Sequence, residues 1–487
     1  MKKMNLLVMS LVSAAALSFS SCSSNDDLTG GAGNQSKVES FYMTFTVQTP
    51  TSNGTRTQQQ TDKVPATEVE TKITSGTFYL VDQNTKKTVF TKHITASELS
   101  NAAPESPTTG TTKSKIEVPV QNVKEDVNYI VYFLANTTDA TPWTNTYTAP
   151  TGFTGAYATD NNFVMFNQND KNSHADKYIV KFVAANKDIN NAAKVSEPIM
   201  LDRATARIDK PTSEKTTIEG TIPDGASDLQ KKAIADAKDK VKTITLSKYA
   251  ITNLSNKTNI MQQWDATWNA LQIPTDITYI QPQANLGGQY DLKNPEWFTD
   301  AAKNYVFENT AETPTTMYFE YTVELDETKF SDTPDCTDGT FYRYNGNIYR
   351  SIAAIYAAYA DQPVLFGGKT AEALKGELKI SAEGKIGATE EELAKFREDN
   401  VIEVFRAGKT YYSQVIKDHW LTTNTIQRNT VYQLKVKNIF NVGADVPNGK
   451  PDENKPMYYL DVEVSVNPWV LSTQDVNLPQ FGLTSSI

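Results

Sequence analysis

The sequence predicts a mostly β protein built from antiparallel β-sandwiches with a few short helices. Three observations predict this class: short segments in which apolar and polar residues alternate, turn residues between these segments, and few stretches with a helical period. The 487 residues are enough for two or three domains. Frequent Thr, Asn, Tyr and Val residues fit exposed β-structure in a secreted protein.

The first predicted strand, residues 40–50, is the element on which the functional interpretation depends. Its apolar residues occupy every second position, as in a strand with one buried face: Phe41, Met43, Phe45 and Val47. Residues 49–61 that follow are polar and include Arg56, so we expect an exposed linker. Two interpretations remain open from the pattern alone. The segment is either a first strand with a surface loop, or a strand that is removed by cleavage at the linker.

The N-terminus has the layout of a secretory signal. Lys2 and Lys3 precede the apolar residues 6–19, which are too few to span a membrane and end in Ser-Ser-Cys. Residues 1–21 are therefore predicted to be a signal peptide, and the segment around Cys22 resembles a bacterial lipoprotein box. Cys22 would then carry lipid (palmitate) as the mature N-terminus. The alternative is an ordinary signal peptide whose last residue happens to be cysteine.

Further strands are expected throughout the chain. Residues 127–134 are apolar on both faces and are predicted to form a central strand. Residues 197–208 are predicted to join two domains. The other predicted strands are 76–81, 115–120, 162–166, 178–184, 216–222, 243–254, 317–324, 341–344, 347–350, 410–416, 431–439 and 457–466. Residues 470–487 form a tail with no evident partner in their own domain.

Helices and turns are predicted from local signals. Ser227 with Gln230, and Thr389 with Glu392, are capping-box pairs that predict helices over residues 228–240 and 390–398. Residues 352–360 are rich in Ala, Tyr and Ile and are predicted to form a short helix. Asn-Gly at 345–346 is the strongest hairpin signal in the chain.

No catalytic, cofactor-binding or metal-binding residues are predicted. The three histidines, His93, His174 and His419, are far apart, and no zinc, nucleotide or serine-hydrolase motif occurs. A Cys336–His419 pair is formally conceivable, but the aspartates around Cys336 would raise the thiol pKa. The net charge of −10 and pI near 5.1 disfavour nucleic acid and anionic membranes as partners. The chain is not expected to be an enzyme.

Several segments, taken in order, resemble the Mfa-type fimbrillins, which are type V pilin subunits of the Bacteroidia. In the first half these are residues 129–136 (Tyr-Ile-Val-Tyr-Phe-Leu-Ala-Asn), 163–165 (Phe-Val-Met) and 201–207 (Leu-Asp-Arg-Ala-Thr-Ala-Arg). In the second half they are residues 408–412 (Gly-Lys-Thr-Tyr-Tyr), 426–432 (Ile-Gln-Arg-Asn-Thr-Val-Tyr) and 462–469 (Val-Glu-Val-Ser-Val-Asn-Pro-Trp). Each motif alone is unspecific, and the resemblance rests on their order from the lipoprotein box to the tail.

The resemblance implies a lipoprotein precursor that is carried to the outer membrane and folds as two transthyretin-like β-sandwich domains. A trypsin-like or arginine-specific protease would cut between Arg56 and Thr57, which makes residues 22–56 a propeptide. Residues 57–204 would then form the N-terminal domain, and residues 205–487 the C-terminal domain with its tail. The residues beside Arg56 give no signature of their own, so only the arginine and the expected exposure support this site.

The resemblance also implies how subunits join. The first strand leaves after the cut, and a strand from the tail of a neighbouring subunit fills the groove, so that copies of the chain build a fimbrium with accessory pilus subunits. Within residues 470–483, we expect these donor residues: Val470, Val476, Leu478, Phe481 and Leu483. The processing protease and, before cleavage, the outer membrane are the other expected partners.

Two alternatives come from other functional classes. A surface glycan-binding lipoprotein would share the acylated cysteine, the acidic charge and the β-sandwiches, and could use the six tryptophans as sugar platforms. It would keep its lipid and its first strand, whereas a pilus stalk subunit loses both at Arg56. The second alternative is a fimbrial anchor or tip subunit, which would keep its lipid or lack a usable donor tail.

Overall fold

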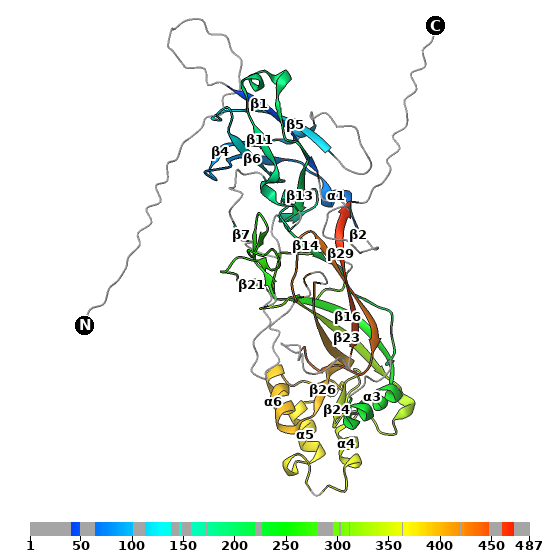
Figure 1. Cartoon of the computed structure of the whole chain (residues 1–487). Helices are drawn as coiled ribbons and strands as arrows, with labels where there is room; N and C mark the ends of the chain where they lie inside the picture. Colours follow the sequence, from blue (N-terminus) through cyan, green and yellow to red (C-terminus); the bar gives the residue numbers. More distant parts are fainter. Residues whose placement is uncertain are drawn as a thin grey trace, which may run out of the picture. The chain divides into compact units, whose positions relative to one another are not determined.

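The computed structural model describes most of the chain from residue 40 onward, and all described residues fall in one compact unit, Ser40–Ile487. The described residues are 40–48, 64–100, 113–137, 146–148, 157–171, 173–219, 226–280, 296–300, 303–310, 312–362, 364–418, 421, 423–447 and 460–471. They form mainly strands, with a few short helices, which confirms the predicted class (Figure 1).

The first half of the chain forms a nine-stranded sheet. Its strands in spatial order are β12 (Ala193–Lys194), β1 (Phe41–Gln48), β13 (Ile199–Arg203), β10 (Met165–Asn167), β6 (Asn128–Ala135), β3 (Gly76–Asp82) and β4 (Thr88–Ile94). In addition, β5 (Lys113–Val120) pairs with β1, and β11 (Ile179–Lys181) pairs with β6. Although three strands separate β1 from β3, the ring of Phe45 stacks on Phe78. The sheet therefore curls so that β1 and β3 face each other across a core.

Strand β6 is buried on both faces, as predicted for residues 127–134. Tyr129, Val131 and Phe133 contribute to the core that β1 also fills. Ile130, Tyr132 and Leu134 contribute to a second core on the opposite face. The alternation of side chains along a strand explains this division, and it identifies β6 as a central strand.

The second half forms another sandwich. One layer has the order β2 (Val64–Ala66), β29 (Leu460–Leu471), β28 (Thr430–Ile439), β14 (Ala206–Ile208) and β22 (Asn304–Val306), with β15 (Thr212–Ser213) beside β28. The other layer contains β16 (Val241–Thr252), β23 (Thr316–Leu325) and β27 (Lys409–Val415). Both layers contribute side chains to one apolar core, for example Leu434 from β28 and Phe319 from β23.

The chain passes between the two main sheets within the predicted junction, residues 197–208. Strand β13 ends at Arg203 in the nine-stranded sheet, and β14 begins at Ala206 in the six-stranded one. The division into domains 57–204 and 205–487 itself stays a prediction. Parallel pairs, which were not predicted, join β1 to β12 and β13, β28 to β14 and β15, and β2 to β29.

The chain between β23 and β27 forms a small sheet with helices packed on it. The sheet contains β24 (Phe341–Tyr344), β25 (Asn347–Tyr349) and β26 (Glu403–Phe405), and the helices are α4 (Ile352–Ala358), α5 (Ala371–Leu378) and α6 (Glu390–Asn400) (Figure 1). These elements share their own apolar core. The predicted Asn-Gly hairpin connects β24 and β25, with positive φ at Asn345 and Gly346. At Gly346 a Cβ atom would also lie 2.9 Å from that of Ala233.

The remaining elements include further helices and two-stranded pairs. The helices are α1 (Glu68–Thr71), α2 (Ala96–Ser100) and α3 (Asp228–Lys240). The two-stranded pairs are β7 (Thr146–Thr148) with β18 (Lys257–Asn259), β8 (Ala158–Thr159) with β9 (Asn162–Phe163), β17 (Leu254–Ser255) with β21 (Tyr279–Ile280), and β19 (Gln263–Trp264) with β20 (Leu271–Gln272).

One predicted strand is wrong in its described part. Residues 216–219 of the predicted strand 216–222 are not in a ladder, although the side chain of Ile218 is buried. The reason is that their backbone bonds go to two different elements. Ile244 donates to the Thr216 carbonyl oxygen, whereas Glu219 donates to the carbonyl oxygen of Ile439. The segment thus connects two strands instead of pairing along one.

The capping box predicted for α3 is present and supports a testable prediction. The Ser227 hydroxyl accepts from Gln230 N at 3.2 Å, and Gln230 Oε1 accepts from Ser227 N at 2.8 Å. Replacing Ser227 by alanine should lower the free energy of unfolding by about 1 kcal/mol, because a backbone donor loses its partner. Urea denaturation measures this, and Ser227→Asp, which keeps a cap, should restore most of the loss. An unchanged midpoint in the alanine variant would contradict the capping role.

Candidate functional site around strand β1

Strand β1 fills the core of the nine-stranded sheet with the four predicted side chains. All four residues are buried, and at most 5% of the surface of each is exposed to solvent: Phe41, Met43, Phe45 and Val47. Phe45 stacks on Phe78, with ring centroids 5.1 Å apart, and lies 5.8 Å from the ring of Phe133. At the other end of the strand, Phe41 meets Phe182 edge to face at 5.6 Å. The strand is therefore part of the core and not an addition to its surface.

The backbone of β1 is paired on both sides. One edge pairs antiparallel with β5 over its full length, from Phe41 opposite Val120 to Gln48 opposite Lys113. The other edge pairs in parallel with β12 at Met43 and with β13 at Val47. In the described part of the chain, β5 has no ladder other than the one with β1. Loss of β1 would leave a long groove with unpaired backbone groups along both walls.

The other predicted site residues lie at or beyond the limits of the described chain. Cys22, Arg56 and Thr57 are outside the described residues, as are Val476, Leu478, Phe481 and Leu483. Val470 is described and belongs to β29, where it lies opposite Pro65 of β2 in a parallel pair. At Val470, the expected donor segment thus overlaps a strand that is paired within the same subunit.

The segment that follows the predicted cleavage site is held by the second half of the chain. Strand β2 pairs with the end of β29, from Val64 opposite Trp469 to Ala66 opposite Leu471 (Figure 1). Helix α1 comes directly after β2 and carries Glu70, which is fully buried. Residues 64–71 are therefore fixed near the point where the C-terminal tail begins.

Glu70 is the centre of a buried ionic network that connects distant segments. Its Oε1 atom accepts hydrogen bonds from Lys303 Nζ at 2.8 Å and from the Tyr305 hydroxyl at 2.7 Å. Arg207 Nη1 lies 3.1 Å from the same atom, and Thr67 N donates to Oε2 at 2.7 Å. Burial would raise the pKa of Glu70, but these hydrogen bonds and the Arg207 charge outweigh it and lower the pKa to about 2. The carboxylate is charged at any physiological pH.

Two of the motifs behind the family resemblance meet next to this network. Arg203, from residues 201–207, donates to the Glu70 carbonyl oxygen at 2.7 Å and to Asn429 Oδ1 at 2.8 Å. Asn429, from residues 426–432, donates to Asp202 Oδ1 at 3.1 Å and from its backbone to the Thr205 carbonyl oxygen at 2.8 Å. Burial lowers the pKa of Arg203 to about 10, so it stays charged at neutral pH. Both motifs therefore have a structural role where the sheets adjoin.

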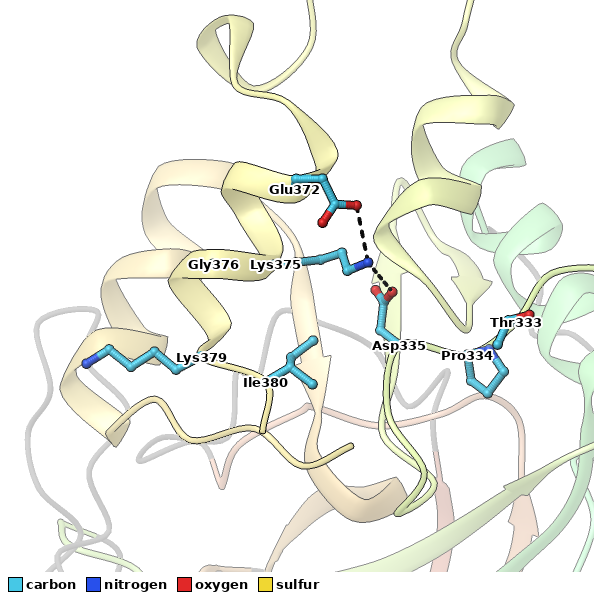
Figure 2. Close-up of a pocket in the computed structure, with 8 residues that line it drawn as sticks. All are labelled: Thr333, Pro334, Asp335, Glu372, Lys375, Gly376, Lys379 and Ile380. Atoms are coloured by element: carbon cyan, nitrogen blue, oxygen red, sulfur yellow. Dashed lines mark hydrogen bonds and ion pairs between the residues drawn. The ribbon is translucent and has the colours of Figure 1, made fainter. Parts of the chain in front are cut away.

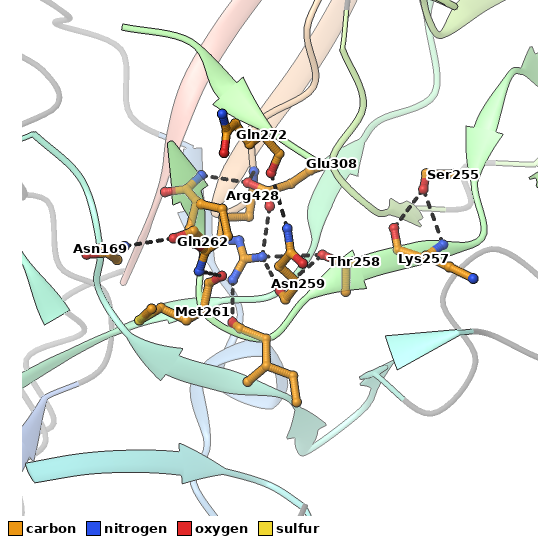
Figure 3. A network of polar contacts seen from close by, with 12 residues as sticks. Asn169, Ser255, Lys257, Thr258, Asn259, Met261, Gln262, Gln272, Glu308 and Arg428 are labelled. Atoms are coloured by element: carbon orange, nitrogen blue, oxygen red, sulfur yellow. Dashed lines mark hydrogen bonds and ion pairs between the residues drawn. The ribbon is translucent and has the colours of Figure 1, made fainter. Parts of the chain in front are cut away.

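Arg428 forms a second buried ion pair. Its Nη2 atom lies 2.8 Å from Glu308 Oε2, and its Nη1 atom donates to the Ile260 carbonyl oxygen at 2.7 Å. Gln262 Nε2 donates to the other Glu308 oxygen at 2.6 Å, as Figure 3 shows. Asn169 Nδ2 reaches the Gln262 carbonyl oxygen at 2.7 Å. With Arg428 and Glu308 almost fully buried, this network fixes the loops between the two main sheets.

A cleft of about 560 Å³ lies beside α5 and is shown in Figure 2. Its charged groups are already paired: Lys375 Nζ lies 3.3 Å from Glu372 and 3.6 Å from Asp335. Asp335 also accepts a hydrogen bond from Ile352 N at 2.7 Å, at the start of α4. Burial raises the pKa of Asp335. We interpret the cleft as a structural contact, in which the Lys375–Asp335 ion pair holds α5 against the segment before β24.

In the described parts of the chain, the cysteine and the histidines considered as catalytic candidates do not form a reactive site. Cys336 is buried, and burial together with the Asp338 charge raises its pKa to about 11, in agreement with the expected direction. His174 stacks on Trp268 at 4.2 Å, His93 lies 3.4 Å from the Thr77 hydroxyl, and His419 is outside the described residues. In the ranges that the structure describes, no group of three His, Cys, Asp or Glu residues could hold a metal ion.

The role of Glu70 is not predicted from the sequence. The Thr-x-x-Glu pattern at residues 67–70 was a weak helix-start signal, and the carboxylate of Glu70 does accept from Thr67 N. Its other partners, Arg207, Lys303 and Tyr305, are more than 130 residues away in the sequence, and local patterns cannot show such contacts. Among the described helices, none is long and apolar enough to cross a membrane.

Comparisons with known proteins agree with the resemblance. Residues 403–475, which contain strands β26 to β29, match the family described as the C-terminal part of fimbrillin, a major fimbrial subunit protein type IV. No curated protein sequence matches the chain.

Three solved structures are similar over most of the chain. A fimbrilin of Porphyromonas gingivalis (FimA) is 15% identical, with a TM-score of 0.44 over 90% of this chain and 100% of that one. A candidate cell adhesion protein of Parabacteroides distasonis is 13% identical (TM-score 0.46, covering 90% and 99%). The tip fimbrial protein Mfa3 of P. gingivalis is 12% identical (TM-score 0.33, covering 88% and 100%). The match over residues 403–475 agrees with the family resemblance found in the sequence, and this part of the chain is similar to the C-terminal part of fimbrillin.

Proposed function

We propose that this chain is a structural subunit of a cell-surface fimbrium and that it polymerises by protease-triggered donor-strand exchange. One observation carries the proposal. Strand β1 is a buried core strand that is paired on both edges, and it precedes the polar, Arg56-containing residues 49–63. A cut at Arg56 would separate this strand covalently from the rest of the sheet.

The free energy of burying β1 favours a groove refilled by another strand over a groove that stays empty. Full burial of four apolar side chains contributes about 6–12 kcal/mol, at roughly 1.5–3 kcal/mol for each. This is comparable to the whole stability of a domain. A subunit that has lost β1 would therefore be poised to bind another strand, which would restore the apolar contacts and the sheet hydrogen bonds. Because groove and donor belong to opposite ends of the chain, the contact extends into a filament and does not close on itself.

The contacts of the segment after residues 49–63 support the idea that the rest of the subunit survives the cut. Glu70 and β2 hold the segment after residues 49–63 to the second half of the chain. The new N-terminus would stay with the subunit, and only residues before the cut would leave. We further propose that the precursor is an outer-membrane lipoprotein through Cys22 and that cleavage releases the subunit from its lipid into the fimbrium.

Cleavage by an arginine-specific protease tests the proposal. Within residues 49–63, Arg56 is the sole arginine, whereas trypsin could also cut after Lys63. Treated precursor should begin at Thr57 in N-terminal sequencing and form filaments in electron microscopy. Cleavage elsewhere in the chain, or a Thr57 terminus with monomers only, would contradict the mechanism.

The variant Arg56→Ala should remain uncut by the arginine-specific protease and should not polymerise. Arg56→Lys is the matched control, because it keeps the positive charge at this position but should also remain uncut by the arginine-specific protease. If Arg56→Ala formed filaments as readily as the unaltered chain after the same treatment, the assigned bond would be wrong.

A further inference from the structure

Three polar side chains at the contact between α5 and α6 form a closed triangle. Lys369 lies just before α5, Glu377 lies within it, and Asn400 is the last residue of α6. Lys369 Nζ donates to Asn400 Oδ1 at 3.2 Å and lies 2.9 Å from Glu377 Oε1. The other carboxylate oxygen, Glu377 Oε2, accepts from Asn400 Nδ2 at 3.4 Å. One carboxylate therefore contacts both an amine and the amide that this amine touches.

The fold holds the amide in place and brings the amine to it. Asn400 is 2% exposed, and its Nδ2 atom also donates to the Phe396 carbonyl oxygen at 2.9 Å, so its Oδ1 atom is left to face the lysine. On the other side of the contact, Gly367 and Gly368 precede Lys369 and both have positive φ, which glycine adopts without steric cost. The amine and the amide are therefore fixed neighbours.

We propose that Lys369 and Asn400 become joined by an isopeptide bond, which the folded chain forms by itself with Glu377 as the acid–base group. Glu377 takes a proton from the Lys369 ammonium, and the neutral Nζ attacks Cγ of Asn400. Glu377 then gives this proton to Nδ2 and accepts the second one from Nζ as the Cγ–Nδ2 bond breaks. The ammonia leaves with that proton as ammonium. In sum, a lysine ammonium and a carboxamide give a secondary amide and ammonium, and no other reactant is consumed.

Proximity is what makes this reaction feasible. Free amines hardly attack carboxamides in water, but well-oriented groups in one molecule react as if their concentration were on the order of 10⁵ M or more. The triangle supplies both this proximity and a carboxylate that can move the protons. Because 34% of the Lys369 side chain is exposed, water can reach the site and carry the ammonium away, which drives the reaction toward the bond.

A second lysine–asparagine contact in the chain serves as an internal control. Lys171 Nζ donates to Asn269 Oδ1 at 3.4 Å, and both residues are exposed. The Nδ2 atom of Asn269 donates to the Thr267 hydroxyl and not to a carboxylate. This pair has the amine and the amide but lacks the acid–base group, so it should stay unlinked.

The bond would close residues 369–400 into a covalent loop that contains α5 and α6. Such a closure stabilises a fold chiefly by restricting the unfolded chain, as a disulfide does. The chain has two cysteines, and Cys336 is buried and free. Unlike a disulfide, an isopeptide bond would hold this part of the surface protein together under reducing conditions as well.

Mass spectrometry of the purified, unaltered protein tests the proposal. Its mass should be lower than that of its sequence by one ammonia, about 17 Da. After denaturation and trypsin digestion, residues 351–375 and 398–406 should appear as one branched peptide, in which the linked Lys369 is no longer cut. Peptides that contain Lys171 and Asn269 should be separate in the same digest.

Two variants assign the roles. Lys369→Arg removes the nucleophile, and Glu377→Gln keeps the size of the side chain but cannot carry the protons. Each should restore the full mass and abolish the branched peptide, whereas Lys171→Arg should leave the branched peptide in place.

Three results would overturn the proposal. These are full mass and separate peptides in the unaltered protein, a loss of ammonia that maps to another part of the chain, or a branched peptide that persists undiminished in Glu377→Gln. None of these results bears on whether the chain forms filaments, so the proposed function is tested separately.

Discussion

Replacing Glu70 by alanine is expected to lower the free energy of unfolding by about 3–5 kcal/mol, because it leaves the buried Arg207 guanidinium without this carboxylate and removes the acceptor of Lys303 and the Tyr305 hydroxyl. The side chain of Glu70 is fully buried, and Arg207 beside it is only 4% exposed. Urea denaturation at neutral pH measures the loss. The matched control is Glu68→Ala, in the same helix but exposed, which should change the stability by less than about 1 kcal/mol. Equal losses in the two variants would contradict the assigned network.

The same carboxylate should make stability depend on pH in a defined direction. Its pKa is about 2 in the folded protein against a usual value of 4.5, so the folded state binds the proton more weakly than the unfolded chain does. Its contribution, about 3 kcal/mol, is therefore complete above about pH 5 and is lost as the pH falls toward 2. Glu70→Gln should remove this dependence. Unfolding midpoints of both proteins between pH 7 and pH 3 should converge as the pH decreases, and a constant difference would contradict the interpretation.

Replacing Phe45 by alanine should also have a large effect, about 3–5 kcal/mol, because it removes a ring packed between Phe78 and Phe133. In the uncut precursor the loss appears as a lower urea midpoint. After cleavage at Arg56 the same substitution should make β1 leave faster, since the strand is then held by its contacts alone. Mass spectrometry of the subunit after separation from the propeptide follows this release.

The control for Phe45 is Thr46→Ala on the same strand. Thr46 is half-buried and outside the core, so this variant should lose less than about 1 kcal/mol and should release β1 at nearly the unaltered rate. If Phe45→Ala released the propeptide no faster than Thr46→Ala, the core contacts of β1 would not control its departure.

Much of the fold follows from local patterns in the sequence. The alternation in residues 41–47 predicted a buried strand, and the capping boxes at Ser227 and Thr389 predicted the starts of α3 and α6. The Asn-Gly pair predicted the β24–β25 hairpin. These signals involve residues close together in the chain, so they can be read without knowledge of tertiary contacts.

What the patterns did not predict depends on distant contacts or on weak local signals. Helix α5 was not predicted, and it contains Gly376, a poor helix former. The strand predicted for residues 216–222 was wrong because its described backbone bonds to two separate elements. The Glu70 network joins segments separated by more than 130 residues. The cleavage bond and most donor residues lie outside the described chain, so they remain predictions from the sequence and the family.

The N-terminal residue of the protein in fimbriae collected from cells tests the central claim most directly. Edman sequencing or mass spectrometry of these fibres should find subunits that begin at Thr57 and lack β1. Fibres whose subunits still begin at an acylated Cys22 and retain β1 would contradict the account.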